Sequence, residues 1–222
     1  MTESLRPSDA VAEKAIASFL DMYCYPSRVT EFKRYDDRES QLQGKDVSFS
    51  YGGRRLVVDE KAQAHYVNRN LPTFAFEIDF IDAGGGAHDG WLFNADLPTE
   101  CYLLIWPYAT KPGITSEEDI VHVDCLLVSR VAVKSLLMSV GYDEARCRAV
   151  ALAMRRDDVR GKYDIGQEDF YFFLSDRLAE RPVNIVIRKN VLASLAIASW
   201  NVMRPSIKGG SQRMGGSDYA DG

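Results

Sequence analysis

Residues 46–63 read DVSFSYGGRRLVVDEKAQ, and this stretch decides the expected fold. Two short runs rich in Val, Phe and Tyr flank Gly52-Gly53, a dipeptide that favours the tight turn of a β-hairpin. The first strand is expected at roughly 46–51 and the second at roughly 54–63. The period of two in both runs indicates a sheet with one face buried.

The second strand of this hairpin carries a row of polar residues. Side chains alternate across a strand, so Asp59, Lys61 and Gln63 are expected on one face and Glu60 on the other. Asp46 opens the first strand, and pairing across the hairpin brings its carboxylate beside that of Asp59. Two neighbouring carboxylates repel each other, and a hard divalent cation relieves that repulsion. The pattern therefore favours a metal site with a lysine beside it.

The order of these residues resembles a known family. Asp46, followed by Asp59-Glu60-Lys61 on an adjoining strand, is similar to the PD-(D/E)xK nuclease superfamily, which has the restriction-endonuclease-like fold. The resemblance implies that Asp46 and Asp59 bind Mg²⁺, with Mn²⁺ as a substitute, and that the Glu60 backbone carbonyl completes the coordination. It implies that Lys61 serves the attacking water. Gln63 stands where several members carry a glutamine near the scissile phosphate.

Two further residues are candidates for the same centre. Some members of the superfamily draw a glutamate from the first helix, and Glu13 is the matching residue. His65 extends the polar row and could assist proton transfer. The alternative for the whole row is a solvent-facing ion pair of Asp59 and Lys61 on a half-exposed strand, which would contribute about 0–1 kcal/mol.

A second acid-x-Lys match occurs at Glu31-Phe32-Lys33. Tripeptides of this kind arise readily by chance in a charged chain. We prefer 59–61 because it follows a Val-Val strand and has an upstream Asp across a hairpin. Glu31 lies in a segment with poor periodicity and no earlier acid on a strand.

Composition indicates a globular protein with a substantial core. Apolar residues make up 46% of the chain and aromatic residues 11%, as in chains that bury a large interior. The four cysteines are scattered without a CxxC pair, which disfavours a zinc site or a disulfide framework. Neither a signal-peptide segment nor an apolar run of membrane-spanning length is evident. We therefore expect a cytoplasmic protein with no membrane partner.

The net charge of −5 disfavours a protein that coats nucleic acid non-specifically. Basic residues nevertheless gather in the segment 144–162. Arg155, Arg156 and Arg160 are candidate contacts to nucleic-acid phosphates. A solvated helix face is the alternative explanation of this run.

Hydrophobic periodicity and breaker residues predict the remaining elements. Helices are expected at 8–24, 130–140, 143–156 and 189–202. Strands are expected at 29–35, 73–80, 91–93, 101–106, 119–129, 169–174 and 183–188. Residues 1–204 are predicted to form a single nuclease-like domain, and the Gly/Ser-rich residues 205–222 a disordered tail.

The expected fold is therefore α+β, with a restriction-endonuclease-like core. A mixed central sheet would be flanked by helices and followed by an extended β-meander and C-terminal helices. The expected function is that of a Mg²⁺-dependent nuclease, or endonuclease, that hydrolyses phosphodiester bonds, with DNA as the expected substrate. The alternative is an inactive nuclease-like module that binds nucleic acid or a protein partner. A homodimer is compatible with the nuclease hypothesis, since cutting a duplex needs two centres.

Overall fold

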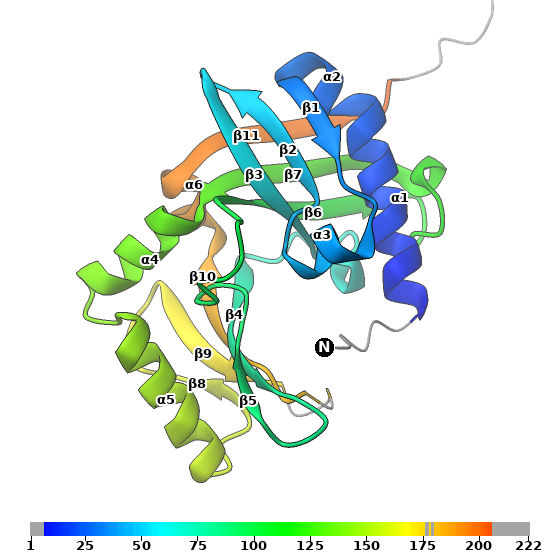
Figure 1. Cartoon of the computed structure of the whole chain (residues 1–222). Helices are drawn as coiled ribbons and strands as arrows, with labels where there is room; N and C mark the ends of the chain where they lie inside the picture. Colours follow the sequence, from blue (N-terminus) through cyan, green and yellow to red (C-terminus); the bar gives the residue numbers. More distant parts are fainter. Residues whose placement is uncertain (1–6, 176–177, 179, 206–222) are drawn as a thin grey trace, which may run out of the picture.

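The computed structural model describes residues 7–175, 178 and 180–205 (Figure 1). The helices are α1 (Pro7–Tyr23), α2 (Tyr25–Arg28), α3 (Arg38–Leu42), α4 (Arg130–Ser139), α5 (Glu144–Arg156) and α6 (Lys189–Leu195), with 3₁₀ turns η1 (Ala64–Tyr66) and η2 (Glu117–Asp119). The strands are β1 (Thr30–Arg34), β2 (Val47–Tyr51), β3 (Arg54–Ala62), β4 (Thr73–Ile81), β5 (Ala87–Asp89), β6 (Cys101–Ala109), β7 (Ile120–Ser129), β8 (Gly161–Tyr163), β9 (Phe170–Leu174), β10 (Val183–Arg188) and β11 (Ala196–Met203). The fold is α+β, as predicted.

A mixed six-stranded sheet contains the predicted hairpin. Its strand order is β1-β2-β3-β6-β7-β11. β2 and β3 pair antiparallel from Val47↔Val58 to Tyr51↔Arg54. Gly52 and Gly53 both have positive φ in the turn, a conformation that glycine adopts without steric cost. The two glycines therefore set the register that the sequence predicts.

The sheet becomes mixed at β3 and β6, which pair in parallel from Val58↔Cys101 to Ala62↔Ile105. Parallel neighbours need a crossover connection. Here that connection, residues 63–100, contains η1, β4 and β5. The predicted β-meander is therefore wrong after β3, because the next strand, β4, belongs to a second sheet.

A second, five-stranded sheet has the order β5-β4-β10-β9-β8, and all its pairs are antiparallel. It lies below the first sheet in Figure 1, with α4 and α5 beside it. β4 and β10 are far apart in the chain, so their pairing could not be inferred from local patterns. The segment 63–100 and the C-terminal part of the chain build this sheet together.

Two buried clusters cover the two faces of the six-stranded sheet. On one face, α1 contributes Ile16, Phe19 and Leu20, which pack with Leu56 and Val58 of β3. We call this side the α1 face. On the opposite face, Tyr102 and Leu104 of β6 pack with the second sheet, α4 and α5. Because strand residues alternate, Asp59 and Lys61 lie on the face opposite α1.

Two predicted elements are wrong. Residues 91–93 form turns instead of a strand. The helix predicted at 189–202 ends at Leu195, and β11 then pairs antiparallel with β7. Ala198, Trp200 and Val202 are buried while Ser199 and Asn201 are exposed, which is the period of a strand. That alternation was present in the sequence and was hidden by the helix-forming residues before it.

None of the described helices is both long and apolar enough to cross a membrane. All four cysteines are buried and free. The tail predicted to be disordered falls, from residue 206 onward, outside the described residues.

Candidate active site

The pairing of β2 with β3 brings together Asp46 and Asp59, the two aspartates expected to bind metal. Asp46 immediately precedes β2, and extending the register by one residue places it opposite Asp59. The Asp46 N–H donates to the Val58 carbonyl over 3.2 Å, and Asp46 Oδ2 accepts from the Glu60 N–H at 2.7 Å. The aspartate is therefore fixed to β3 by both its backbone and its side chain.

Lys61 completes the group on the same face. Its Nζ lies 3.1 Å from Asp59 Oδ1 and 5.4 Å from the centre of the Trp91 ring. Asp59 is only 2% exposed, whereas the Lys61 side chain is 28% exposed. The Lys61 ammonium thus lies between the buried Asp59 carboxylate and the solvent.

The surroundings of Asp46 and Asp59 are unfavourable when both carboxylates are charged. Burial, and then the charge of Asp59, raise the pKa of Asp46 to about 7, although the Lys61 ammonium opposes the shift. Asp59 Oδ2 is buried and has no hydrogen-bond partner among the described residues. Buried polar atoms are nearly always satisfied. A proton or a cation between the two side chains would remove both problems.

The donor set fits a divalent metal that binds oxygen. Mg²⁺ commonly uses one or two carboxylates and fills its other positions with water and substrate phosphate. Asp46 and the unsatisfied Oδ2 of Asp59 supply two such oxygens. Within the described part of the chain, no group of three or more His, Cys, Asp or Glu could hold a metal. The arrangement therefore suits an ion shared with a substrate better than a closed structural site.

A glycine allows the preceding loop to lie against Asp59. Gly44 has a φ of +63°, and a Cβ placed on it would lie 2.8 Å from Thr99 Oγ1 and 3.2 Å from Asp59 Oδ2. Thr99 is buried, and its hydroxyl donates to the Gly44 carbonyl at 2.6 Å. Gly44 is thus required both by its backbone conformation and by its closeness to the site.

Gly44→Ala is expected to destabilise the protein by about 2–4 kcal/mol, because it adds a steric clash to the cost of a left-handed alanine. Gly52→Ala is the matched control. Gly52 has a φ of +57° but nothing within 4 Å of its Cβ position, so it should cost only about 1 kcal/mol. Urea unfolding of both variants measures the difference. Equal losses would show that the close contacts of this position with Thr99 and Asp59 do not affect stability.

The Glu60 carboxylate lies on the α1 face, away from the aspartates. It accepts from Arg34 Nη1 at 2.8 Å and Nη2 at 3.0 Å, and the Tyr25 hydroxyl also donates to it. Arg34 in turn holds Asp21 of α1 through two contacts of 2.7 Å. Glu60 could therefore reach a metal only through its backbone carbonyl, as the resemblance implies.

This buried network was not foreseen from the sequence. Arg34, Asp21 and Tyr25 come from three elements, and no local pattern links them to Glu60. The one available signal was the position of Glu60 on the apolar side of β3, where an unpaired charge would be costly. A partner for it could have been expected, although not identified.

Gln63 and His65 do not continue the polar row. β3 ends at Ala62, and Gln63 has non-strand dihedral angles at the start of η1. Its Nε2 donates to the Thr73 carbonyl at 2.7 Å, while its Oε1 is buried without a partner among the described residues. His65 is exposed within η1. The strand expected at roughly 54–63 thus ends at Ala62, and the expected extension of the polar row to His65 is wrong, because the chain turns there toward β4.

The other candidate residues lie apart from the aspartates. Glu13 is exposed on α1, which packs on the opposite face of the sheet. Arg155 holds Asp79 of β4 with two contacts of 2.7 Å. Arg156 and Arg160 are exposed and pair with the neighbouring Asp157 and Asp158. The guanidinium of Arg155 thus has a structural partner, which removes the reason for assigning it to phosphate.

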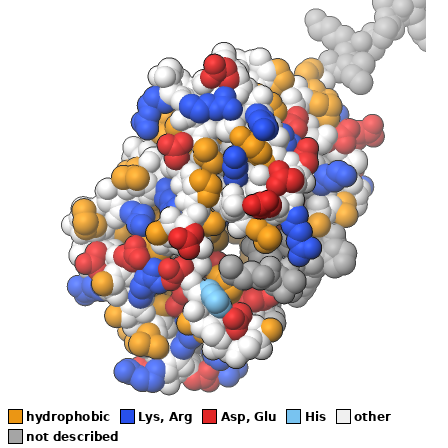
Figure 2. All heavy atoms as spheres, in the orientation of Figure 1, with side chains coloured by type: hydrophobic (Ala, Val, Ile, Leu, Met, Phe, Trp, Pro, Cys, Tyr) orange, Lys and Arg blue, Asp and Glu red, His pale blue; other side chains and the backbone are white. Residues whose placement is uncertain are grey.

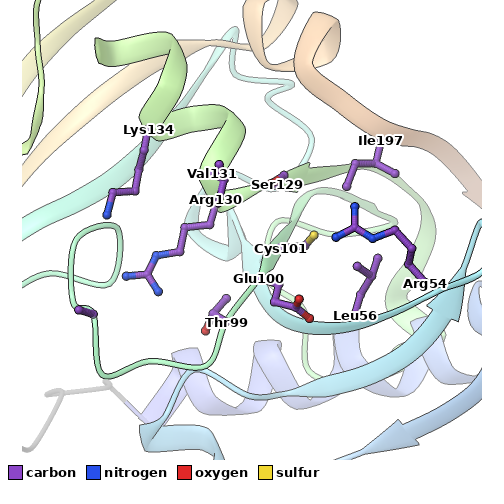
Figure 3. Close-up of a pocket in the computed structure, with 11 residues that line it drawn as sticks. Arg54, Leu56, Thr99, Glu100, Cys101, Ser129, Arg130, Val131, Lys134 and Ile197 are labelled. Atoms are coloured by element: carbon purple, nitrogen blue, oxygen red, sulfur yellow. The ribbon is translucent and has the colours of Figure 1, made fainter.

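A cavity of about 360 Å³ opens at the beginning of β3 and β6 (Figure 3). Arg54 of β3 and Lys134 of α4 line it together with Glu100, which precedes β6. Thr99 also lines this cavity and donates to the Gly44 carbonyl, so the cavity adjoins the loop that precedes Asp46. Sequence reasoning did not single out these residues.

Comparisons with protein-family models, with curated proteins and with solved structures find no significant match to this chain. The interpretation of the site therefore depends on its own geometry.

Proposed function

We propose that this protein is a metal-dependent nuclease that hydrolyses phosphodiester bonds of nucleic acid, with DNA as the expected substrate. The observation that carries the proposal is the grouping of Asp46, Asp59 and Lys61 on one face of the β2–β3 hairpin. Lys61 Nζ lies 3.1 Å from Asp59 Oδ1, and burial and the charge of Asp59 raise the pKa of Asp46. A carboxyl group whose pKa is raised by burial and by a neighbouring charge, with a lysine nearby, is typical of catalytic centres.

The architecture is compatible with the restriction-endonuclease-like core that the sequence suggests. The six-stranded sheet is mixed, and α1 covers one of its faces. Asp46 and the Asp59-Glu60-Lys61 segment lie on neighbouring strands or next to them, as the resemblance requires. One feature departs from the resemblance: the superfamily usually has a helix after the lysine strand, whereas here η1, β4 and β5 follow β3.

Each residue of the site has a distinct role in the proposal. Asp46 and Asp59 would hold Mg²⁺, and the Glu60 N–H keeps Asp46 in place through its 2.7 Å hydrogen bond. A bound Mg²⁺ supplies Lewis acidity toward the phosphate and lowers the pKa of a water. The Lys61 ammonium, partly in solvent, would orient the attacking water or stabilise negative charge on the phosphate.

Incubation with labelled nucleic acids tests the proposal. Single-stranded, duplex and branched DNA, and RNA, would each be treated with purified protein and Mg²⁺ or Mn²⁺. Cleavage is expected with metal, should stop on addition of EDTA, and should be lost in the Asp59→Ala/Lys61→Ala double variant. The exposed pair Arg156 and Asp157 gives the matched control, since its double alanine variant removes the same types of charge and should retain activity.

Cleavage that survives in the Asp59→Ala/Lys61→Ala variant would overturn the assignment. The rival function is an inactive nuclease-like module that binds nucleic acid or a protein. It predicts binding without cleavage and no increase in melting temperature on addition of Mn²⁺. Its support is the ion pair between Lys61 and Asp59, which could serve structure alone.

A further inference from the structure

Beside Asp46, two lysine ammonium groups lie close to one aromatic ring. Tyr35 directly follows β1, and its N–H donates to the Asp46 carbonyl at 2.8 Å. Lys33 Nζ lies 4.7 Å from the centre of the Tyr35 ring, and Lys45 Nζ lies 4.0 Å from it. We call these three residues the Tyr35 cluster. They come from both sides of the α3 segment and converge on the strand edge next to Asp46.

The strand register places this cluster on the same side of the sheet as the aspartates. Lys33 pairs with Ser48, whereas Arg34 and Val47 point into the α1 face. The Tyr35 hydroxyl lies 3.0 Å from Ser48 Oγ, which fixes the position of the ring. The cluster therefore lies on the same face of the sheet as Asp46 and Asp59.

No salt bridge accounts for the two lysines. Among the described residues, neither Lys33 nor Lys45 forms an ion pair with a carboxylate; both lie against Tyr35. Asp46 follows Lys45 directly in the chain, but its Oδ2 accepts from the Glu60 N–H. Asp37 is engaged as the N-cap of α3 through Ser40. Two like charges gathered on one ring repel each other. An anion bound between them would relieve that repulsion.

The mixed charge of the surrounding surface favours a small anion-binding site over a broad basic patch. Figure 2 shows acidic and basic side chains interspersed over the face in view, and the net charge of the chain is −5. Non-specific attraction of a polyanion would therefore be weak. Recognition must come from a small group in which cations and an aromatic ring act together.

We propose that the Tyr35 cluster is the substrate-binding platform of the site and that its ligand is a single-stranded segment of nucleic acid. Lys33 and Lys45 would move from the Tyr35 ring to the flanking phosphates, and the ring they uncover would stack on an unpaired base. Aromatic stacking with backbone cations is the usual chemistry of single-strand binding. A base inside a duplex has no free face for the ring. The proposal deepens the nuclease assignment, since it gives the substrate class of the same centre.

Fluorescence anisotropy in EDTA measures this binding without cleavage. The full chain is titrated against a labelled single-stranded oligonucleotide and against a duplex of the same sequence, at several salt concentrations. The single strand is expected to bind more tightly. Tyr35→Leu should weaken single-strand binding by about 10-fold, with Tyr35→Phe close to wild type, because stacking contributes on the order of 1–3 kcal/mol per base. Lys33→Ala/Lys45→Ala should reduce the slope of log K against log salt by about 1.4.

The five-stranded sheet offers a matched control. Lys162 Nζ lies 4.8 Å from the Tyr171 ring, so Lys162→Ala and Tyr171→Leu remove the same chemistry elsewhere and should leave binding unchanged. Equal affinity for the duplex, or full single-strand binding by Tyr35→Leu, would overturn the platform. Metal-dependent cleavage that needs Asp59 but not Tyr35 would overturn the platform and leave the nuclease assignment standing. Tyr35-dependent binding without cleavage would support the platform and count against the nuclease.

Discussion

Replacement of Asp46 by asparagine is expected to raise the melting temperature of the metal-free protein at pH 8 by about 5 °C. In the wild-type protein, burial and the charge of Asp59 raise the pKa of Asp46 to about 7, so at pH 8 this carboxylate is charged in an unfavourable place. The asparagine side chain of the variant carries no charge, and its oxygen can still accept from the Glu60 N–H. A gain on the order of 2 kcal/mol corresponds to a few degrees for a protein of this size.

The sign of the pH dependence follows from the same pKa. The ordinary pKa of an aspartate is 3.8, and that of Asp46 in the folded protein is about 7. Between these limits the folded protein holds a proton that the unfolded chain has lost. Stability of the metal-free wild type should therefore fall as the pH rises from about 4 to about 7. The advantage of Asp46→Asn should be small at pH 5 and largest near pH 8. Thermal unfolding in EDTA at both pH values measures it.

Bound metal should make the melting temperature of the wild type higher than that of Asp46→Asn. Mn²⁺ is expected to raise the melting temperature of the wild type and not that of Asp46→Asn, because a ligand that binds only the folded state stabilises it by mass action. Nuclease activity should fall at least 100-fold in the variant, in line with the loss of a major electrostatic contribution to catalysis. Asp157→Asn, at an exposed ion pair, is the control and should change neither property. A variant less stable than wild type at pH 8 would show that Asp46 is a structural carboxylate.

The candidate site could be predicted because its determinants are local. Gly52 and Gly53 set the turn, and the turn sets the register that places Asp46 opposite Asp59. Alternation along β3 then separates Asp59 and Lys61 from Glu60. These steps need only the geometry of a hairpin, and the structure agrees with each of them.

The features that could not be predicted from the sequence depend on contacts between distant parts of the chain. Nothing near β4 indicates that it pairs with β10 instead of continuing the first sheet. The same holds for Arg155, which resembled a phosphate contact until its pairing with Asp79 was known. The Tyr35 cluster was hidden for a related reason, since Lys33 and Lys45 meet on one ring only when β1 and β2 are paired.

The second large effect is expected at Arg34, whose replacement by methionine should destabilise the protein by about 3–5 kcal/mol. The Arg34 side chain is 16% exposed and pairs with Glu60, 10% exposed, and with Asp21, 33% exposed. Its loss leaves the Glu60 carboxylate buried without its cation, and burial already raises the pKa of this group even with Arg34 present. Arg156→Met, at a pair exposed by more than half, is the control and should have little effect on stability, because exposed ion pairs contribute little. Urea unfolding at pH 8 compares them.

A double variant shows whether Arg34→Met destabilises the protein through an unpaired buried charge or through lost packing. If the cost comes from the stranded charge, Arg34→Met/Glu60→Gln should recover about half of the lost stability, because a buried neutral amide is less costly than a buried carboxylate. If the cost comes from lost packing, the double variant should be no better than Arg34→Met. Mn²⁺ affinity gives a second readout, since the Glu60 N–H that holds Asp46 belongs to the residue that Arg34 anchors. Weaker Mn²⁺ binding by the folded double variant would mean that the Arg34–Glu60 pair on the α1 face positions Asp46 and Asp59 on the opposite face. Unchanged Mn²⁺ binding would mean that this pair contributes to stability alone.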